Sequence, residues 1–279
     1  MKISTTKFTP LQGGRGAVSK GLISFSIFIF LSLPGISQGS DYQAIFGSDW
    51  DKALEFEKEN RSWMEPILEK NNIPYDLALA VIFPELVRYS ALRDKMEITL
   101  LKALYINLGE TYANFSIGQF QMKPSFAETI RREAPSALAR RSGISFRQAV
   151  EFGHISDYRK SIVTDLEDPK SEFLYLVAFC KIADKKYRTF RMNDKERVRF
   201  LATAYNYGID KSKEEIESMS DKKFFNTKLF KTQNYSYAEV SLFWYDNYRT
   251  TKNQGHAMAC TYNLDNCMQG RCMQRPYRK

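Results

Sequence analysis

Glu85 directly follows a nearly unbroken apolar run in the segment LALAVIFPELVRYS, residues 77–90. An ionised carboxylate is costly to bury, so a glutamate in such surroundings has either a partner or a chemical task. The structural interpretation is an ion pair with Arg88, one helical turn further along the chain. The functional interpretation is a general acid, because apolar surroundings disfavour the anion and keep the proton on near neutral pH. Pro84 removes one helical hydrogen bond and predicts a bend or an end of the helix here.

A second segment, YANFSIGQFQMKPSF at residues 112–126, combines residue types that suit a sugar-binding loop. Gly118 allows a close backbone approach, and Gln121 offers both a donor and an acceptor. Phe120 and Met122 are apolar. A sugar needs hydrogen bonds at its edges and an apolar surface under its ring, so these four residues are our candidates for substrate binding. Taken alone, the segment is also compatible with an ordinary loop before a helix.

A third segment, LATAYNYG at residues 201–208, places Tyr205 and Asn206 at the C-terminal end of an apolar helical pattern. There the two side chains can present a hydroxyl and an amide to a common site. The structural alternative is a packed tyrosine followed by an Asn-x-Gly helix end.

In this order, the three segments resemble the catalytic domain of the lytic transglycosylase family, which shares its fold with goose-type lysozyme. The family pattern is an apolar helix with the catalytic glutamate, then Gly-x-x-Gln-x-x-Pro, then Ala-Tyr-Asn-x-Gly. Here these are VIFPE, GQFQMKP and AYNYG, within about residues 72–208. The resemblance implies that Glu85 is the catalytic acid and base and that Gln121 lines the glycan cleft. It also implies that Tyr205 forms a hydrogen bond near the glutamate and orients it, with Asn206 supporting that loop.

Departures from the family pattern concern substrate fit more than the identity of the acid. Leu86 stands where a serine usually follows the glutamate, and Tyr112 stands where a serine is expected. Lys123 precedes the motif proline, where an apolar residue is common. The first two motifs are also further apart than in the family. Residues 94–109 are therefore predicted to form an inserted helix that reshapes one end of the cleft.

The activity implied by the resemblance is cleavage of the β-1,4 bond between MurNAc and GlcNAc in peptidoglycan, with no metal or cofactor. In this family the substrate's acetamido group supports the oxocarbenium-like centre, and one glutamate donates a proton and then withdraws one from the C6 hydroxyl. The product is a 1,6-anhydro-muramoyl end.

Two alternatives remain at this stage. A lysozyme-type hydrolase needs a second carboxylate or a positioned water, and the nearest acids downstream are Asp94, Glu97 and Glu110. A non-catalytic glycan-binding or scaffold protein would keep the same fold, and Leu86 in place of the serine favours this alternative.

The elements that must position these residues are predicted to be helices, in one all-α, lysozyme-like domain over residues 40–279 with a helical, cysteine-containing extension at 209–279. Asp76 is expected to cap the helix that carries the glutamate. Asp168-Pro169 opens another helix, and Asn193 with Glu196 forms a capping box. The predicted helices cover residues 49–70, 76–90, 94–109, 123–134, 145–152, 169–187, 193–208 and 236–249.

Residues 1–39 have the order of a secretory signal peptide. Cationic residues and no acidic ones come first, then the apolar core LISFSIFIFLSL (residues 22–33), then small residues. The core is short for a membrane span. We therefore expect export to the periplasm or cell envelope; an uncleaved segment that anchors the protein in the membrane is the alternative.

The formal net charge of +9 falls to about +5 without the signal segment. Such an excess suits an anionic polymer, including wall glycan with acidic stem peptides. No nucleic-acid motif accompanies it, so nucleic acid is not an expected partner. Protein partners at the cell wall or membrane are left unspecified.

The four cysteines predict disulfides or free thiols more strongly than a metal site. Cys260, Cys267 and Cys272 could form one disulfide among themselves, or two if Cys180 joins them. Their spacing matches no zinc signature well, and His256 does not complete one.

Overall fold

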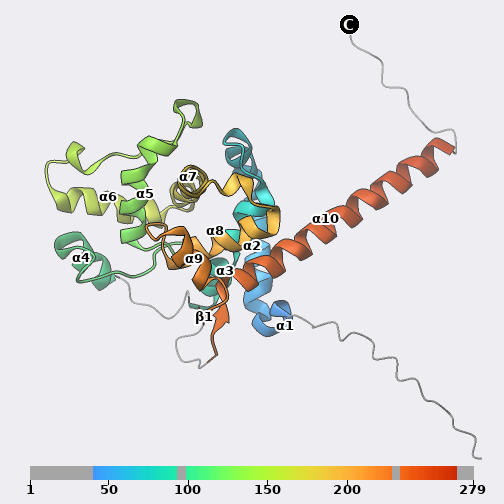
Figure 1. Cartoon of the computed structure of the whole chain (residues 1–279), viewed down its shortest axis with the longest axis horizontal. Helices are drawn as coiled ribbons and strands as arrows, with labels where there is room; N and C mark the ends of the chain where they lie inside the picture. Colours follow the sequence, from blue (N-terminus) through green and yellow to red (C-terminus); the bar gives the residue numbers. More distant parts are fainter. Residues whose placement is uncertain (1–39, 93–98, 228–232, 269–279) are drawn as a thin grey trace, which may run out of the picture. The chain divides into compact units, whose positions relative to one another are not determined.

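The computed structural model describes residues 40–92, 99–227 and 233–268, and the side chains within 40–90, 99–227 and 233–252. These residues belong to one compact unit that begins at Ser40. Ten α-helices and one small antiparallel sheet form the described part of the chain (Figure 1). The all-α class is therefore confirmed. The predicted signal segment lies outside the described residues.

The described helices and strands have the following bounds. The helices are α1 (Tyr42–Phe46), α2 (Ser48–Lys70), α3 (Tyr75–Leu92), α4 (Thr99–Leu108), α5 (Pro124–Ala137), α6 (Ile155–Glu167), α7 (Pro169–Tyr187), α8 (Asp194–Tyr207), α9 (Lys213–Met219) and α10 (Tyr237–Met268). Short 3-10 turns occur at Arg140–Ser142, Ala149–Glu151 and Thr189–Arg191. The strands are β1 (Lys223–Phe225) and β2 (Tyr235–Ser236).

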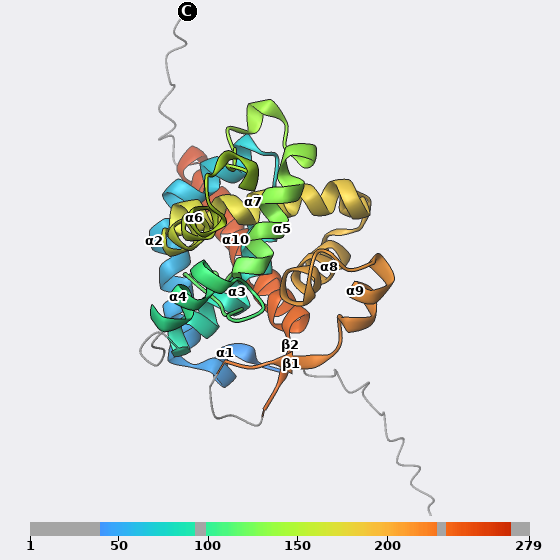
Figure 2. The same cartoon turned by 90° about the vertical axis from the view of Figure 1, so that its left-hand side faces the viewer.

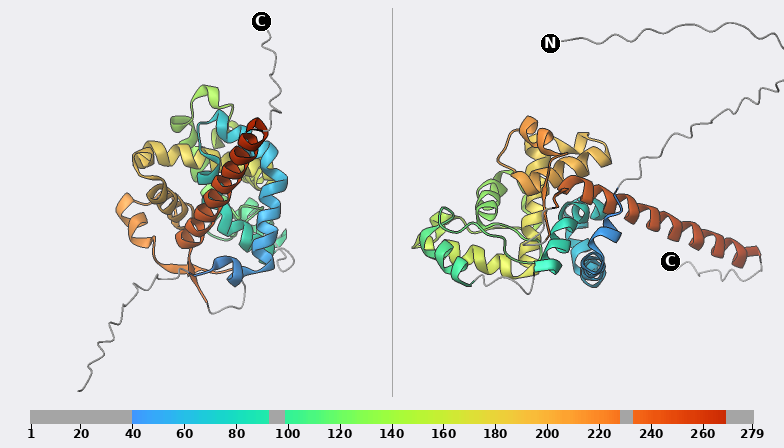
Figure 3. Two further views of the ribbon diagram at one scale, coloured as in Figure 1. Left: turned by 90° about the vertical axis from the view of Figure 1, so that its right-hand side faces the viewer. Right: turned by 90° about the horizontal axis from the view of Figure 1, so that it is seen from below.

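Helix α3 is the central element, because its apolar run is enclosed on several sides. It packs against α2, α8 and α10 (Figures 1 and 3). Every side chain from Ala78 to Phe83 is fully buried. The helix continues through Pro84, so the predicted alternative of a helix end at this proline is wrong. Just before the proline, the Tyr237 hydroxyl of α10 donates a hydrogen bond to the Val81 carbonyl over 2.9 Å.

The helices from α4 to α7 form a second group. Helix α5 packs against α6 and α7, and α4 packs against α6 (Figure 2). The predicted inserted helix is present as α4, although residues 93–98 lie outside the described part of the chain. The insertion therefore adds to the helical group around α5 and α6.

Two of the three predicted helix caps are confirmed. Asp168 accepts a hydrogen bond from the Ser171 backbone N–H over 2.9 Å at the start of α7. Asn193 and Glu196 form the predicted capping box of α8. Helix α3 begins at Tyr75, and Asp76 lies inside its first turn. The prediction that Asp76 caps this helix is therefore wrong.

Three predictions for the irregular segments need correction. Residues 145–152 form no regular helix: only Ala149–Glu151 make a 3-10 turn, because the backbone is extended at both Gln148 and Phe152. The Gln148 side chain donates to the carbonyls of Arg131 (3.0 Å) and Phe146 (2.9 Å). Helices α1, α6 and α9 were not predicted. The extension is not purely helical, since β1 and β2 precede α10, and α10 itself continues to Met268.

Cys180 is a free thiol, fully buried in α7. The predicted alternative of two disulfides requires Cys180 and therefore has no support. The side chains of the other cysteines lie outside the described residues. None of the helices in the described ranges is both long and apolar enough to cross a membrane.

The packing of α10 on α3 yields a prediction about stability. Trp244 is 2% exposed and stacks on Phe83, with ring centroids 5.2 Å apart. We expect Trp244→Ala to lower the free energy of unfolding by about 3–5 kcal/mol in denaturant titration, because it leaves a cavity against α3. Phe190→Ala is the control, with an expected loss below about 0.5 kcal/mol, because Phe190 is 60% exposed. Equal losses in both variants would contradict a core role for Trp244.

Candidate functional site

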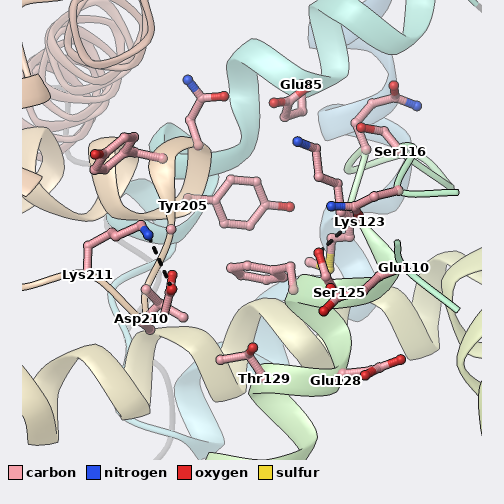
Figure 4. A pocket seen from close by; sticks show the side chains of 18 of the residues that line it. Glu85, Glu110, Ser116, Lys123, Ser125, Glu128, Thr129, Tyr205, Asp210 and Lys211 are labelled. Carbon is pink, nitrogen blue, oxygen red and sulfur yellow. Dashed lines mark hydrogen bonds and ion pairs between the residues drawn. The ribbon is translucent and has the colours of Figure 1, made fainter. Parts of the chain in front are cut away.

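A cavity of about 580 Å³ opens beside the C-terminal half of α3 (Figure 4). Its walls come from α3, the segment before α5, the first turns of α5 and the end of α8. The predicted site residues Glu85, Gln121, Met122, Tyr205 and Asn206 all line it. The fold thus brings together side chains from all three sequence motifs.

Glu85 is the buried carboxyl group of this cavity, with 3% of the residue exposed. Burial raises the pKa of Glu85 to about 7, because the apolar surroundings disfavour its anion. The positive charges of Arg88 and Lys123 act in the opposite direction and lower this pKa. A carboxyl group in this state can hold a proton near neutral pH and release it.

The two oxygens of Glu85 have different surroundings. Arg88 Nη1 donates a hydrogen bond to Oε1 over 3.2 Å. The same nitrogen lies 3.1 Å from Oε2, but without hydrogen-bond geometry, so Oε2 has no hydrogen-bond partner among the described residues. Of the two oxygens, Oε2 is the one without a hydrogen bond, so it is our candidate for the oxygen that carries the proton. The two interpretations of Glu85, an ion pair with Arg88 and a general acid, are therefore compatible.

Arg88 is itself held by the hairpin after α9. Its Nε donates to the Asn226 carbonyl over 3.0 Å, and its guanidinium lies 4.4 Å above the centre of the Phe225 ring. Nothing in the three motifs pointed to this contact, which joins residues far apart in the sequence. The position of Arg88, and with it that of Oε1, depends on the extension.

The second motif forms a tight turn on the wall of the cavity. Backbone hydrogen bonds of 2.9 and 3.0 Å join Ile117 and Met122. Gly118 and Gln121 both have positive φ values, of 77° and 52°. The Gln121 side chain donates back to the Gly118 carbonyl over 3.0 Å, so one of its donors stabilises the turn itself.

Glu172 of α7 is the residue that the sequence analysis missed. It is fully buried, and its carboxyl oxygens accept from the Phe120 backbone N–H over 3.1 and 3.2 Å. Burial raises the pKa of Glu172 well above its usual value. The backbone of Gln119 and Met122 lowers the pKa of this carboxyl group, as the Phe120 N–H does. The sequence signal of Glu172 was the same as that of Glu85, a glutamate within an apolar helix.

Tyr205 connects α8 to the same turn. Its hydroxyl donates to the Phe120 carbonyl over 2.8 Å, not to Glu85, so the hydrogen bond implied by the resemblance has a different acceptor. The ring packs against Phe126 and Phe179. Burial raises the pKa of this tyrosine well above its usual value, which keeps the hydroxyl neutral and able to donate.

Two predicted substrate contacts are not on the cavity surface. The Phe120 ring is fully buried and packs on Phe56 and Phe173, so a sugar contact through this ring is wrong. Gly118 faces α7 instead, where an added Cβ would overlap with the Glu172 carboxyl and the Leu166 carbonyl. Both residues shape the turn from inside the protein.

Other polar groups in the cavity add possible ligand contacts. Asn206 Nδ2 is buried without a hydrogen-bond partner among the described residues. Glu110 is exposed, and Glu128 accepts from the Tyr105 hydroxyl over 2.5 Å. Asp94 and Glu97, the other two candidate acids, lie outside the described residues. The described part of the chain contains no group of three acidic, histidine or cysteine side chains able to hold a metal ion.

Comparison with protein-family models, with curated proteins and with solved structures found no match to this chain. A function must therefore be argued from the residues of the cavity and their geometry.

The turn before α5 yields a prediction about glycine. Gly118→Ala should lower the free energy of unfolding by about 1–3 kcal/mol, because a Cβ at this positive φ strains the backbone and meets α7. Gly153→Ala is the matched control, since a Cβ there meets nothing within 4 Å. Thermal and denaturant unfolding of both variants measure the difference. A Gly118 variant as stable as its control would refute the close contact with Glu172.

Proposed function

We propose that this chain is an exported peptidoglycan lytic transglycosylase with a lysozyme-like fold. The observation that carries the proposal is Glu85, a buried carboxyl group that lines the cavity and is paired with Arg88, with one oxygen hydrogen-bonded to the guanidinium and the other without a hydrogen bond among the described residues. The cavity volume of about 580 Å³ lies in the range of sites for small ligands. The substrate would be the MurNAc–GlcNAc β-1,4 bond of a glycan strand.

Protonated Glu85 begins the reaction as the acid. Its Oε2 proton passes to the bridging oxygen as the bond from this oxygen to the anomeric carbon of MurNAc breaks. The acetamido group of the same sugar stabilises the positive charge that develops at that carbon. Glu85 is now a carboxylate, with the Arg88 guanidinium beside it to stabilise the new charge.

The second half of the reaction returns the proton. The Glu85 carboxylate takes the proton of the C6 hydroxyl, and the C6 oxygen attacks the anomeric carbon. This step closes the 1,6-anhydro ring without water and restores the protonated acid. A pKa near 7 suits both directions of transfer, because neither protonation state is strongly disfavoured at neutral pH.

A hydrolase is the second candidate, and the position of Glu110 favours it. This exposed carboxylate lines the same cavity as Glu85, where it could act on a water molecule. Inverting hydrolysis needs two carboxyl groups on either side of the sugar. The two candidates differ in their products, since a hydrolase leaves a reducing end where a transglycosylase leaves an anhydro end.

Export to the periplasm or cell envelope is part of the proposal. It rests on the sequence pattern of residues 1–39 and is compatible with the net charge of about +5 (9 − 4) that remains without this segment. Glycan strands with acidic stem peptides are the partner that this charge fits.

The first experiment compares glycan fragments released from purified peptidoglycan by residues 40–279 and by the Glu85→Gln variant. Mass spectrometry should detect 1,6-anhydro-muramoyl ends, with the rate reduced about 10²- to 10⁴-fold in the variant. Glu110→Gln is the control and should retain most of the activity. Reducing ends that disappear in Glu110→Gln would favour the hydrolase. No release by a folded wild-type protein that binds the wall would leave only a glycan-binding role.

A second prediction concerns pH. Glu85 must be protonated to act, so kcat/KM should fall as the pH rises through its pKa of about 7. The charge of Arg88 lowers this pKa, so Arg88→Met should raise it and move the falling limb about one unit to higher pH. Arg132→Met, which removes another cation of the cavity, should leave the limb in place. A falling limb that moves to lower pH in Arg88→Met would contradict the assignment of Glu85 as the acid.

A further inference from the structure

Lys123 places a positive charge next to the proposed acid. Its side chain is exposed within the cavity and points toward Glu85 (Figure 4). Its charge lowers the pKa of Glu85, whereas burial raises it and has the larger effect. It also stands where the family that this chain resembles often has an apolar residue, so the resemblance does not explain it.

The other cations that line the cavity have partners. Arg88 is bonded to Glu85 and to the Asn226 carbonyl. Lys211 lies 3.5 Å from Asp210, and Arg132 lies 3.9 Å from Glu133. Among the described residues, the Lys123 ammonium forms neither a hydrogen bond nor an ion pair. It is thus the cation of this cavity that is available to a ligand.

A cation in this position is unfavourable for the acid when the cavity is empty. It stabilises the ionised form of Glu85, whereas the reaction starts from the protonated form. A negative group of the substrate at Lys123 would offset this effect. The arrangement therefore favours a substrate with an anion close to the bond that is cleaved.

The proposed substrate can supply such an anion. The muramoyl sugar carries a lactyl ether at C3, on the same ring as the anomeric carbon. In a strand with stem peptides this lactyl group is an amide and neutral. In a strand whose peptides have been removed, it ends in a free carboxylate. A lysine beside the acid distinguishes these two states by charge.

We propose that Lys123 binds a carboxylate of the substrate, namely the lactyl carboxylate of a peptide-free muramoyl residue, an inference that rests on the proposed function. The Ser116 hydroxyl lies in the same part of the cavity and offers a donor to the same group (Figure 4). The chain would then act on strands already stripped of peptides, so an amide-cleaving reaction must precede it.

The test measures binding in the Glu85→Gln background, where the ligands stay intact. Calorimetry compares three ligands of equal length: a peptide-free glycan strand, a peptide-bearing strand and a chitooligosaccharide, which has no carboxylate. Adding Lys123→Met should weaken binding of the peptide-free strand about tenfold, the worth of one charge-assisted hydrogen bond. Binding of the chitooligosaccharide should change less than about twofold. Adding Lys211→Met, which removes a paired cation of the same cavity, is the control and should weaken no ligand selectively.

The outcomes separate the sources of the carboxylate. A selective loss for the peptide-free strand supports the proposal. An equal or larger loss for the peptide-bearing strand would assign the carboxylate to the stem peptide and overturn the lactyl assignment. A loss shared by all three ligands, or no loss, would overturn any carboxylate site at Lys123. Because these readouts need no cleavage, they are independent of whether the wild-type protein releases anhydro ends.

Discussion

The burial of the Glu85 carboxyl group is the constraint on which the rest of the site depends. An ionised carboxylate at 3% exposure would cost several kcal/mol without compensation. Here the cost is reduced in two ways, by a pKa raised to about 7 and by the hydrogen bond from Arg88. Both require that α3 stay enclosed by α2, α8 and α10, because water at this position would restore an ordinary pKa. The stability of the fold and the chemistry of the cavity are therefore linked through one side chain.

Glu85 and Glu172 show how two buried glutamates differ in role. The Glu172 carboxyl accepts from the Phe120 backbone N–H of the turn at residues 117–122, is fully buried and does not line the cavity. Its interactions are used within the fold, so its role is to hold the turn against α7. Glu85 lines the cavity and keeps one oxygen without a hydrogen bond among the described residues. A satisfied buried acid supports structure, and an unsatisfied one next to a cavity is available for chemistry.

The sequence was informative where a feature depended on local chemistry. The helix starts at Asp168 and Asn193 follow from capping residues, and the acid at Glu85 follows from a carboxylate in an apolar run. The same signal occurred at Glu172 but could not be interpreted, because its partner is a backbone turn about fifty residues away. The Phe120 ring was assigned to the sugar for a similar reason. Residue type predicts that a ring is apolar, and only packing decides which way it faces.

The contacts of α3 with the last part of the chain explain why the motif-bearing segment is not the whole site. The resemblance covers about residues 72–208, yet Asn226 and Phe225 hold Arg88, and Tyr237 bonds to α3 one turn before Glu85. These contacts hold Arg88 beside the acid and pack against α3, so they act on Glu85 through the position of its cation and through its burial. Residues after 208 are therefore part of the site, and a fragment that ended there would leave Arg88 without its supports. The extension belongs to the chemistry because it positions the cation that the acid requires.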